Sequence, residues 1–597
     1  MHGPHFALRG LAGHLRSRGI TVAVRDLNIE YFDAMLTPEA LQLAIGRLKL
    51  IEDYTGTQYA LESKLGGATR QTKIDLQRHR AWLAWQSVNP GLAAALPRTI
   101  LDAKETFRDP RRFYNPDLLA EAFAVLDSAL ELLSMPYHPA RISLNSYDQP
   151  DCDFDVASLI EFTADLPNNP FAEFFADCVP GMLAEQPHYI GISINAFSQV
   201  IPGLTIARML KEAGAPHVGI GGNFFERVAD TLSERPHFFE AFADSLAVGE
   251  GERTVEYLVQ ALAAGTSLAE VPNILYYDRD EQVVRVTPTA PPPPMDEVGI
   301  QDLAGLPLDL YLAPDLVLTI QAGKGCYWGR CTFCDSYVGV TPDEKGIDRL
   351  IREITHLRDT YGVRHYQFID EAISPDRLRL IADRFMEADL DIEWFCNGRL
   401  ENRFTPGLMQ VLHAAGLRMV LWGVETGSKR IFKLIRKGVD FEKRIPLLRG
   451  SADAGVWNFA YIFFGFPSET YDEALETVEM ICANTDVIHS YGKSIFTLGK
   501  HAPLFRDAAK LGLVDMYENR EELSTNLHYR DTRGMSDEEL NRASGMCTRL
   551  CAQAYDRGVW FLLRYREFIH LYLCHFGRDA VAQMKMPTYK TPTEQYF

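Results

Sequence analysis

The chain has 597 residues, of which 47% are hydrophobic and 23% are charged, so it can form several ordinary globular cores. With 60 Lys and Arg against 80 Asp and Glu, its formal charge is −20, which argues against a nucleic-acid partner because phosphate binding normally needs a basic face. No apolar run approaches the roughly 18 residues of a membrane helix, and the N-terminus does not resemble a secretory signal. Ten cysteines are too sparse for a disulfide scaffold, so we expect a reduced, cytoplasmic protein that binds no membrane.

The N-terminal third is predicted to be mainly helical. A helix over 6–18 precedes a short buried strand over 21–27, and helical periodicity then extends over 31–185. The clearest helix follows the N-cap Asn115, with Pro116 at its first position. Its apolar residues recur at steps of four and three, which is typical of a core-facing stripe: Leu119, Phe123, Leu126, Leu130 and Leu133.

A different pattern begins after this helical region. Strands are predicted over 189–194, 217–220 and 246–248, with a helix over 204–213 between the first two. Alternation of strand, loop and helix is typical of a parallel, doubly wound sheet, which binds ligands at the carboxyl ends of its strands. Such a sheet needs a strand before the helix over 6–18, so we expect the true start of the protein to lie upstream.

Proline separates this unit from a second α/β unit. A hairpin is predicted over 274–286, and the four prolines 291–294 form the best linker in the chain. Six further strands alternating with helices predict a partial (β/α)6 barrel, with strands near 317–321, 366–369, 392–396, 419–423, 459–464 and 494–498. The fold class is therefore α/β, with these predicted domains: 1–285, Rossmann-like with a helical insertion at about 31–185; 286–312, linker; 313–506, partial barrel; 507–597, helical C-terminal domain.

Three cysteines stand directly after the first strand of the predicted barrel. Cys326, Cys331 and Cys334 lie in the segment 325–334. Three thiolates can hold three irons of a [4Fe-4S] cluster and leave the fourth iron open for a substrate. The alternative is a zinc site, which normally needs four protein ligands, and Asp335 or a distant histidine would be a poor fourth.

This segment resembles the cluster loop of the radical SAM superfamily, including Phe333 before the last cysteine. Four residues separate the first two cysteines, where the family most often has three, which indicates a diverged loop. The resemblance continues along the barrel and implies contacts with S-adenosylmethionine (SAM). It assigns these contacts to Asp370 and Glu371 after the second strand, Glu425 after the fourth and Gly465 after the fifth.

The region 189–258 resembles the cobalamin-binding domain found ahead of many radical SAM barrels. The family's histidine-ligating motif is absent, because the equivalent loop 195–199 contains no histidine. A cofactor-free sheet used for packing is the alternative. The resemblance implies cobalamin contacts from Ser193, Asn195, Phe197, Gly221, Gly222, Gly249, Glu250 and Gly251.

The overall plan resembles cobalamin-dependent radical SAM enzymes, and the helical insertion resembles members associated with peptide natural products. This implies a C-methyltransferase that uses a [4Fe-4S] cluster, SAM and cobalamin, with an external one-electron reductant such as flavodoxin or ferredoxin and a small-molecule or peptide substrate. Two alternatives stay open: a cyclase or rearrangement enzyme with the same cofactors, and a non-enzymatic zinc- or corrinoid-binding protein. No catalytic side chain is assigned. An aromatic helix over 559–576 is expected to pack in the core rather than line a substrate channel, and His489 and Tyr491 near the sixth strand are open candidates for the active site.

Overall fold

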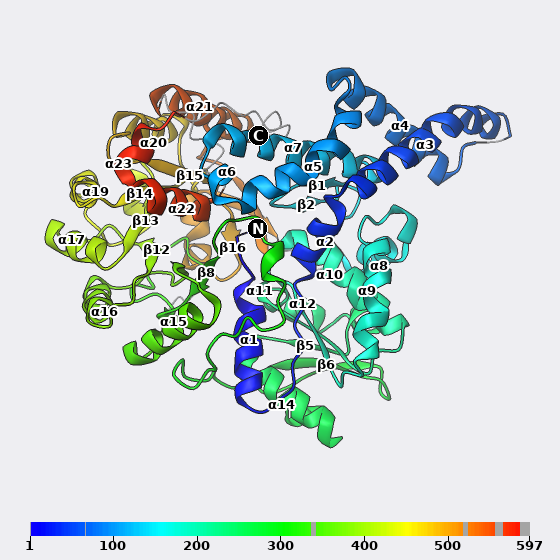
Figure 1. Ribbon diagram of the computed structural model, residues 1–597, viewed down its shortest axis with the longest axis horizontal. Helices are drawn as coiled ribbons and strands as arrows, with labels where there is room; N and C mark the ends of the chain where they lie inside the picture. Colours follow the sequence, from blue (N-terminus) through cyan, green and yellow to red (C-terminus); the bar gives the residue numbers. More distant parts are fainter. Residues whose placement is uncertain are drawn as a thin grey trace.

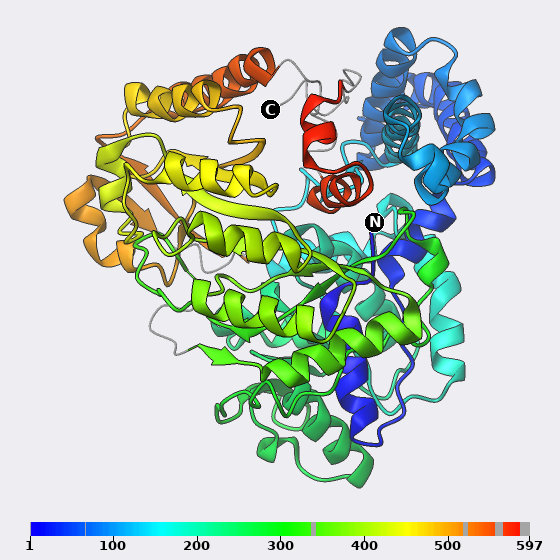
Figure 2. The ribbon, with the colours of Figure 1, turned by 60° about the vertical axis from the view of Figure 1, so that its left-hand side comes forward.

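A computed structural model describes residues 2–65, 67–335, 342–517, 523, 525–555 and 565–585. The described chain is a mixed α/β structure in which two sheet-containing units lie side by side and a group of helices covers one end of both (Figures 1 and 2). In this part of the chain, no helix combines the length and the apolar character that crossing a bilayer requires.

The N-terminal unit contains a five-stranded sheet in the order β3-β4-β5-β6-β7. The first three strands are parallel: β3 (Ile190–Ser193), β4 (Val218–Gly221) and β5 (Ser245–Ala247). The predicted hairpin, β6 (Ile274–Asp278) and β7 (Val283–Val286), extends the sheet antiparallel to β5. The strands follow chain order without a reversal, so the prediction of a doubly wound sheet is wrong, whereas the Rossmann-like strand–helix alternation is confirmed.

Helices cover this sheet on the sides where its strands carry apolar residues. The helix α10 (Val200–Glu212) connects β3 to β4, and α14 (Gly251–Ala264) follows β5. Three short helices lie between β4 and β5: α11 (Asn223–Glu226), α12 (Ala229–Leu232) and α13 (Pro236–Phe242).

The predicted strand over 21–27 is absent from the described fold. Residues 21–26 follow α1 (Phe6–Ser17) without strand pairing, and α2 (Leu27–Met35) begins at Leu27. The helix starts there because the Asp26 side chain caps it, accepting hydrogen bonds from the backbone of Asn28 and Ile29. β3 is the edge strand of its sheet, and residues 20–26 and β3 line the same cavity. The expected strand before α1 is not among the described residues.

The helical insertion is confirmed. In α7 (Pro116–Ser134) the Asn115 side chain caps the N-terminus, and all five residues of the predicted apolar stripe are buried. Two long helices, α3 and α4, project from the rest of the molecule (Figure 1). The other elements of the insertion are α3 (Pro38–Lys64), α4 (Arg70–Val88), α5 (Leu92–Arg108), α6 (Pro110–Phe113), β1 (Arg141–Ile142), β2 (Tyr147–Asp148), α8 (Val156–Ala164) and α9 (Ala172–Ala184).

The segment after the prolines is not a free spacer. The backbone of Asp302 donates to the carbonyl of Arg9 at 3.0 Å, and a Cβ placed on Gly13 would lie 1.8 Å from the Ile300 carbonyl oxygen. The linker therefore packs directly against α1, and this contact requires a glycine in the helix.

The partial barrel is confirmed as six parallel strands in the order β15-β14-β13-β12-β11-β8. The intervening helices cover its outer surface (Figure 1). In chain order the elements are β8 (Val317–Ile320), β9 (Gly323–Lys324), β10 (Asp343–Glu344), α15 (Ile347–Tyr361), β11 (His365–Phe368), α16 (Pro375–Glu387), β12 (Glu393–Gly398), α17 (Pro406–Ala414), β13 (Leu417–Glu425), α18 (Lys429–Leu434), α19 (Arg444–Asp453), β14 (Trp457–Phe464), α20 (Tyr471–Ala483) and β15 (Ser490–Ile495).

The C-terminal region is not purely helical as predicted. A small antiparallel sheet, β16-β18-β17, precedes the helices. Its register is interrupted between Val514 and Tyr517, which explains the weak strand pattern in the sequence. The elements are β16 (Leu498–Gly499), β17 (Leu513–Tyr517), β18 (Asn526–Asp531), α21 (Asp537–Tyr555), α22 (Arg566–Phe576) and α23 (Arg578–Gln583).

The C-terminal aromatic helix is a core element. α22 lies between the barrel and the helical insertion (Figure 2), and the ring of Phe568 packs edge-on against Phe113 of α6 with centroids 5.1 Å apart. Tyr572 is fully buried and its hydroxyl donates to the Phe113 carbonyl at 2.7 Å. The expectation of core packing is thus confirmed for these residues, whereas Trp560 and Phe561 lie outside the described part of the chain.

Candidate cofactor site

The three cysteines lie at the carboxyl end of the barrel sheet. Cys326 forms a parallel bridge with Ala372, the second residue after Asp370, so the loop after β8 runs beside the end of β11. The backbone of Cys334 donates to the Cys331 carbonyl at 3.4 Å, which turns the loop back on itself. None of the three cysteines is in a disulfide, and all three are half-buried. The loops at the carboxyl ends of barrel strands are the usual place of an active site, so cysteines in such a loop are well placed to hold a cofactor.

The thiols influence one another. Burial raises the pKa of the Cys331 thiol to about 11, the charges of Cys334 and Cys326 act in the same direction, and Lys437 opposes them. Neighbouring thiolates repel one another unless a cation lies among them, and a metal binds the thiolate form. Three soft donors in one loop therefore fit an iron–sulfur cluster.

Aromatic residues anchor the unusually long loop. The guanidinium of Arg399, after β12, lies 4.4 Å from the centroid of Trp328 and 5.3 Å from that of Tyr327. The indole of Trp328 also donates to the carbonyl of Arg436 at 3.2 Å. A Cβ on Gly438 would lie 1.9 Å from this indole, so only glycine leaves room for it. The sequence analysis missed these anchors, although two aromatic residues within a four-residue spacer were a visible signal.

Asp370 supports the cluster loop rather than facing the cavity. Its carboxylate accepts a hydrogen bond from the backbone of Ala322 at 3.0 Å, just before the cysteines. Burial raises its pKa to about 6, although backbone hydrogen bonds from Ala322 and Gly323 act in the opposite direction. The predicted SAM contact at Asp370 thus competes with an existing structural role. The neighbouring Glu371 lines the cavity, and enclosure raises its pKa.

Glu425 ends β13 in a strained conformation. Its φ is +69°, a β-bulge lies between Gly423 and Glu425, and its carboxylate is buried in an ion pair with Lys437. A Cβ on Gly423 would lie 1.9 Å from the Lys437 ammonium, so the glycine makes room for the pair. A non-glycine residue in left-handed backbone is costly and is often found at functional sites.

The two other predicted cofactor contacts of the barrel are Phe333 and Gly465. The ring of Phe333 lies 5.4 Å from that of Phe463 on β14. Gly465 follows β14 with a φ of +81°, and its backbone donates to Glu469 at 2.6 Å. Burial raises the pKa of Glu469 to about 7. In contrast, His489 stacks on Trp457 and accepts from the Asn458 backbone, and Tyr491 is buried in the core, so neither lines the cavity.

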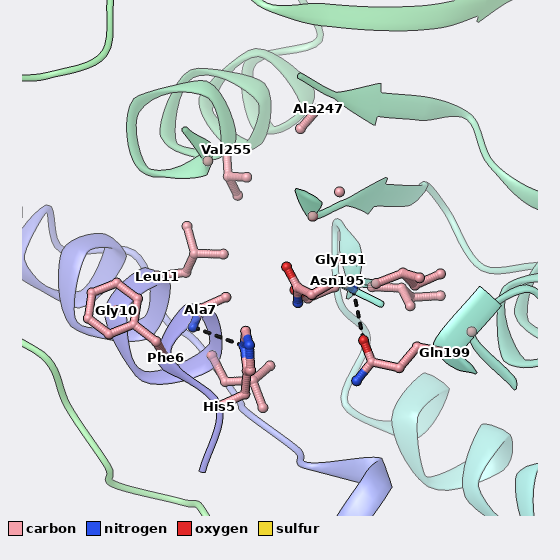
Figure 3. A pocket seen from close by; sticks show the side chains of 18 of the residues that line it. His5, Phe6, Ala7, Gly10, Leu11, Gly191, Asn195, Gln199, Ala247 and Val255 are labelled. Atoms are coloured by element: carbon pink, nitrogen blue, oxygen red, sulfur yellow. Dashed lines mark hydrogen bonds between the residues drawn. The ribbon is translucent and has the colours of Figure 1, made fainter. Parts of the chain in front are cut away.

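One cavity of approximately 2910 Å³ joins the two units. It extends between α1 and the N-terminal sheet, where Leu11, Asn195 and Val255 border an open space (Figure 3). It also reaches the barrel at Gln321 and Glu371. Of the eight residues predicted to contact cobalamin, seven line it: Ser193, Asn195, Gly221, Gly222, Gly249, Glu250 and Gly251.

Phe197 is the exception. Its ring stacks on Phe154 with centroids 4.0 Å apart, and it is not among the cavity-lining residues. At the cavity, the Asn195 side chain donates to the Ser193 hydroxyl at 2.9 Å and accepts from the Asn223 backbone at 3.3 Å. Hydrogen bonds of Asn195 thus fix the loop after β3 at the cavity.

Two ion pairs hold the units together at the cavity. Lys324, two residues before Cys326, pairs with Glu250 after β5 at 2.8 Å. Asp335, directly after Cys334, pairs with Arg227 after α11 at 2.6 Å. The cluster loop is therefore tied on both flanks to the strand-end loops of the N-terminal sheet.

The residues present fit the implied cofactors. The cysteines supply the donors of a cluster, and Glu371 and Glu425 offer carboxylates beside it for the charged groups of SAM. On the other side, Gly249 has a φ of +75° and nothing would contact a Cβ on it within 4 Å, whereas a Cβ on Gly222 would lie 2.3 Å from the Ile194 carbonyl oxygen. This open glycine-rich edge fits the close approach of a large, flat cofactor.

Comparison with known proteins agrees with this geometry. Residues 320–481 match the model of the radical SAM superfamily. The chain is 27% identical over 322 residues to an uncharacterized methyltransferase of Pyrococcus horikoshii, and the match covers 51% of this chain and 66% of that protein. The chain thus spans just under two thirds of this relative's length.

Two solved structures share the fold. One is the radical SAM methyltransferase TsrM of Kitasatospora setae with cobalamin and a [4Fe-4S] cluster bound (TM-score 0.51, 18% identity, 63% of this chain and 80% of that chain). The other is the cobalamin-dependent radical SAM enzyme OxsB with aqua-cobalamin and SAM bound (TM-score 0.52, 16% identity, 68% and 65%). The α/β fold with a radical SAM barrel predicted from the sequence is thereby confirmed.

Replacing Asp370 tests its role in supporting the loop. We expect Asp370→Ala to lower the iron bound per chain after anaerobic reconstitution several-fold, because the backbone of Ala322 loses its acceptor. Glu371→Ala is the matched control, since it removes an adjacent carboxylate that lines the cavity. Equal iron contents in both variants, measured by colorimetric assay, would contradict this role.

Alanine substitutions at two glycines of equal backbone conformation test whether the packing of Trp328 against Gly438 anchors the cysteine loop. Gly438 and Gly362 both have a φ of +72°, but nothing would contact a Cβ on Gly362 within 4 Å. Both alanine variants should lose about 1 kcal/mol of unfolding free energy from strain. Only Gly438→Ala should also reduce the cluster absorbance near 400 nm, roughly the thiolate-to-iron region. Unchanged absorbance in this variant would show that the anchor is dispensable.

Proposed function

Because residues 320–481 form a radical SAM domain, we propose that the chain is a cobalamin-dependent radical SAM methyltransferase acting on an unactivated carbon. One observation carries this proposal: two ion pairs join the segment that contains the three cysteines to the strand-end loops of the other sheet, whose glycines line the cavity. The shared fold with TsrM, which binds both cofactors, and the methyltransferase relative support it.

The chain's residues have separate tasks in this proposal. When bound, the cluster with SAM supplies a one-electron route to a carbon radical, and cobalamin supplies a transferable methyl group. Cys326, Cys331 and Cys334 hold the cluster, while Glu425 and Glu371 orient the sulfonium donor through its charged groups. The ion pair with Lys437 fixes the Glu425 carboxylate in its buried position.

The N-terminal loops position the second cofactor. Gly221 and Gly249 let the backbone approach it, Gly222 leaves room for the Ile194 carbonyl, and the ion pair of Glu250 with Lys324 holds this loop against the barrel. The loop 195–199 supplies no imidazole, so we propose that none of its residues ligates cobalt.

The proposed substrate is a small molecule or peptide from natural-product biosynthesis, a class that rests on the resemblance of the helical insertion. The proposal also requires an external one-electron reductant such as flavodoxin or ferredoxin. A cyclase or rearrangement enzyme with the same cofactors differs in its co-products, which makes the two separable by assay.

Product analysis tests the reaction class. We expect anaerobically reconstituted protein with SAM, cobalamin and a reductant to release both 5′-deoxyadenosine and S-adenosylhomocysteine, measured by liquid chromatography with mass spectrometry. The variant with Cys326, Cys331 and Cys334 changed to Ala should release neither above background. Release of 5′-deoxyadenosine alone would favour the cyclase or rearrangement enzyme, and release of neither by the wild-type protein would contradict both.

Filling the cavity from the N-terminal sheet tests the cobalamin site. A Cβ on Gly221 would make an ordinary 3.6 Å contact with that of Ala247, so we expect Gly221→Leu to fold and to place its larger side chain in the cavity. Retained corrinoid, measured by its visible absorption after gel filtration, should fall at least about tenfold, a loss of about 1.4 kcal/mol of binding free energy.

The control for this variant is Gly46→Leu in α3, where nothing would contact a Cβ within 4 Å. It should retain corrinoid as the wild type does. Equal retention by Gly221→Leu and Gly46→Leu would place the corrinoid elsewhere, whereas iron content should stay the same in both variants.

A further inference from the structure

Far from the cluster loop, three metal-ligating side chains converge at the opposite end of the barrel. His365 is the first residue of β11, and His570 and Cys574 lie on α22. Each offers one ligand atom, and these three atoms lie within 4.8 Å of one another. The cysteine loop is at the other end of the strands, and four residues of β11 alone span roughly 13 Å.

The helix presents its two ligands on one face. His570 and Cys574 are four residues apart, so their side chains point the same way. The Cys574 sulfur lies 3.5 Å from Nε2 and 3.8 Å from Nδ1 of His570. A tetrahedral zinc ion with usual bond lengths of about 2.0 Å to nitrogen and 2.3 Å to sulfur separates two such ligands by about 3.5 Å.

Glu393 is the candidate for a fourth ligand. The carboxylate of Glu393, the first residue of β12, has its Oε2 3.8 Å from Nδ1 of His365. That Nδ1 atom is buried without a hydrogen-bond partner. The other carboxylate oxygen, Oε1, accepts from Arg418 at 2.9 Å, which fixes the group and leaves Oε2 turned toward the histidine.

The surroundings hold the ring of His570 in a fixed orientation. His570 is fully buried, and its ring also hydrogen-bonds the backbone of Glu393, as metal-ligating histidines commonly bond a backbone carbonyl through their second nitrogen. Four charged side chains face the group formed by His365, His570 and Cys574: the acidic Asp315 and Glu393 and the basic Arg364 and Arg418.

We propose that His365, Glu393, His570 and Cys574 form a structural zinc site that fastens α22 to the base of the barrel. Two nitrogens, one thiolate and one carboxylate suit zinc, and a closed set of four protein ligands indicates a structural site. α22 also packs against α6 of the helical insertion, so the ion links the barrel, the C-terminal helix and the insertion. This inference does not depend on the proposed reaction.

Metal analysis of the full chain tests the site. We expect about one zinc per chain after dialysis against a weak chelator, a stoichiometry typical of structural sites. Zinc should persist when Cys326, Cys331 and Cys334 are all changed to Ala, which excludes zinc bound in place of the iron cluster. It should be lost in Cys574→Ala and kept in Cys152→Ala, which removes another buried thiol. Loss of zinc from the variant without Cys326, Cys331 and Cys334, together with retention of zinc by Cys574→Ala, would overturn the proposal.

A second measurement keeps the test decisive if Cys574→Ala fails to fold. Cobalt(II) added to zinc-depleted wild-type protein should produce absorption bands of tetrahedral thiolate coordination, and His365→Gln should weaken or shift them. The zinc-loaded protein should also have a higher Tm than the depleted protein. Octahedral cobalt spectra together with an unchanged Tm would refute the site.

Discussion

The structure depends on the alignment of two sheet edges across one cavity. Parallel strands end at a common edge, so each unit gathers its loops on one side, and the ion pairs Lys324–Glu250 and Arg227–Asp335 join these sides. Both pairs flank the cysteines in sequence. A displacement of either unit would separate the cysteine loop from the glycine-rich loops, and no side chain of one unit alone could compensate.

Buried polar groups give the cysteine loop its shape. Asp370 accepts from the backbone ahead of the cysteines, and Arg399 stacks on the two aromatic residues between the first two. Unpaired, such groups would be costly in the interior, so each bond they make also restricts the loop to one conformation. This explains how a spacer one residue longer than the commonest family pattern is accommodated: Trp328 occupies the space that Gly438 leaves open.

The two ends of the barrel have different roles. The carboxyl end carries the three cysteines and the carboxylate of Glu371, which lines the cavity, as reactive groups are distributed in barrel enzymes. The amino end is covered by α22, whose aromatic residues pack against the helical insertion. The C-terminal helix thereby connects elements distant in the sequence, and His365, His570 and Cys574 converge where it meets the barrel.

Local sequence patterns determined much of this protein. Apolar periodicity identified α7 and the six barrel strands, and the spacing of Cys326, Cys331 and Cys334 identified the cluster loop, because these signals reside in neighbouring residues. Tertiary structure alone decided the rest. Residues 21–26 have strand-like composition but no pairing partner, Phe197 turns to Phe154, and Asp370 bonds the loop backbone. The convergence of His365 with Cys574, 209 positions later in the chain, was equally invisible, since a contact between distant segments leaves no local pattern.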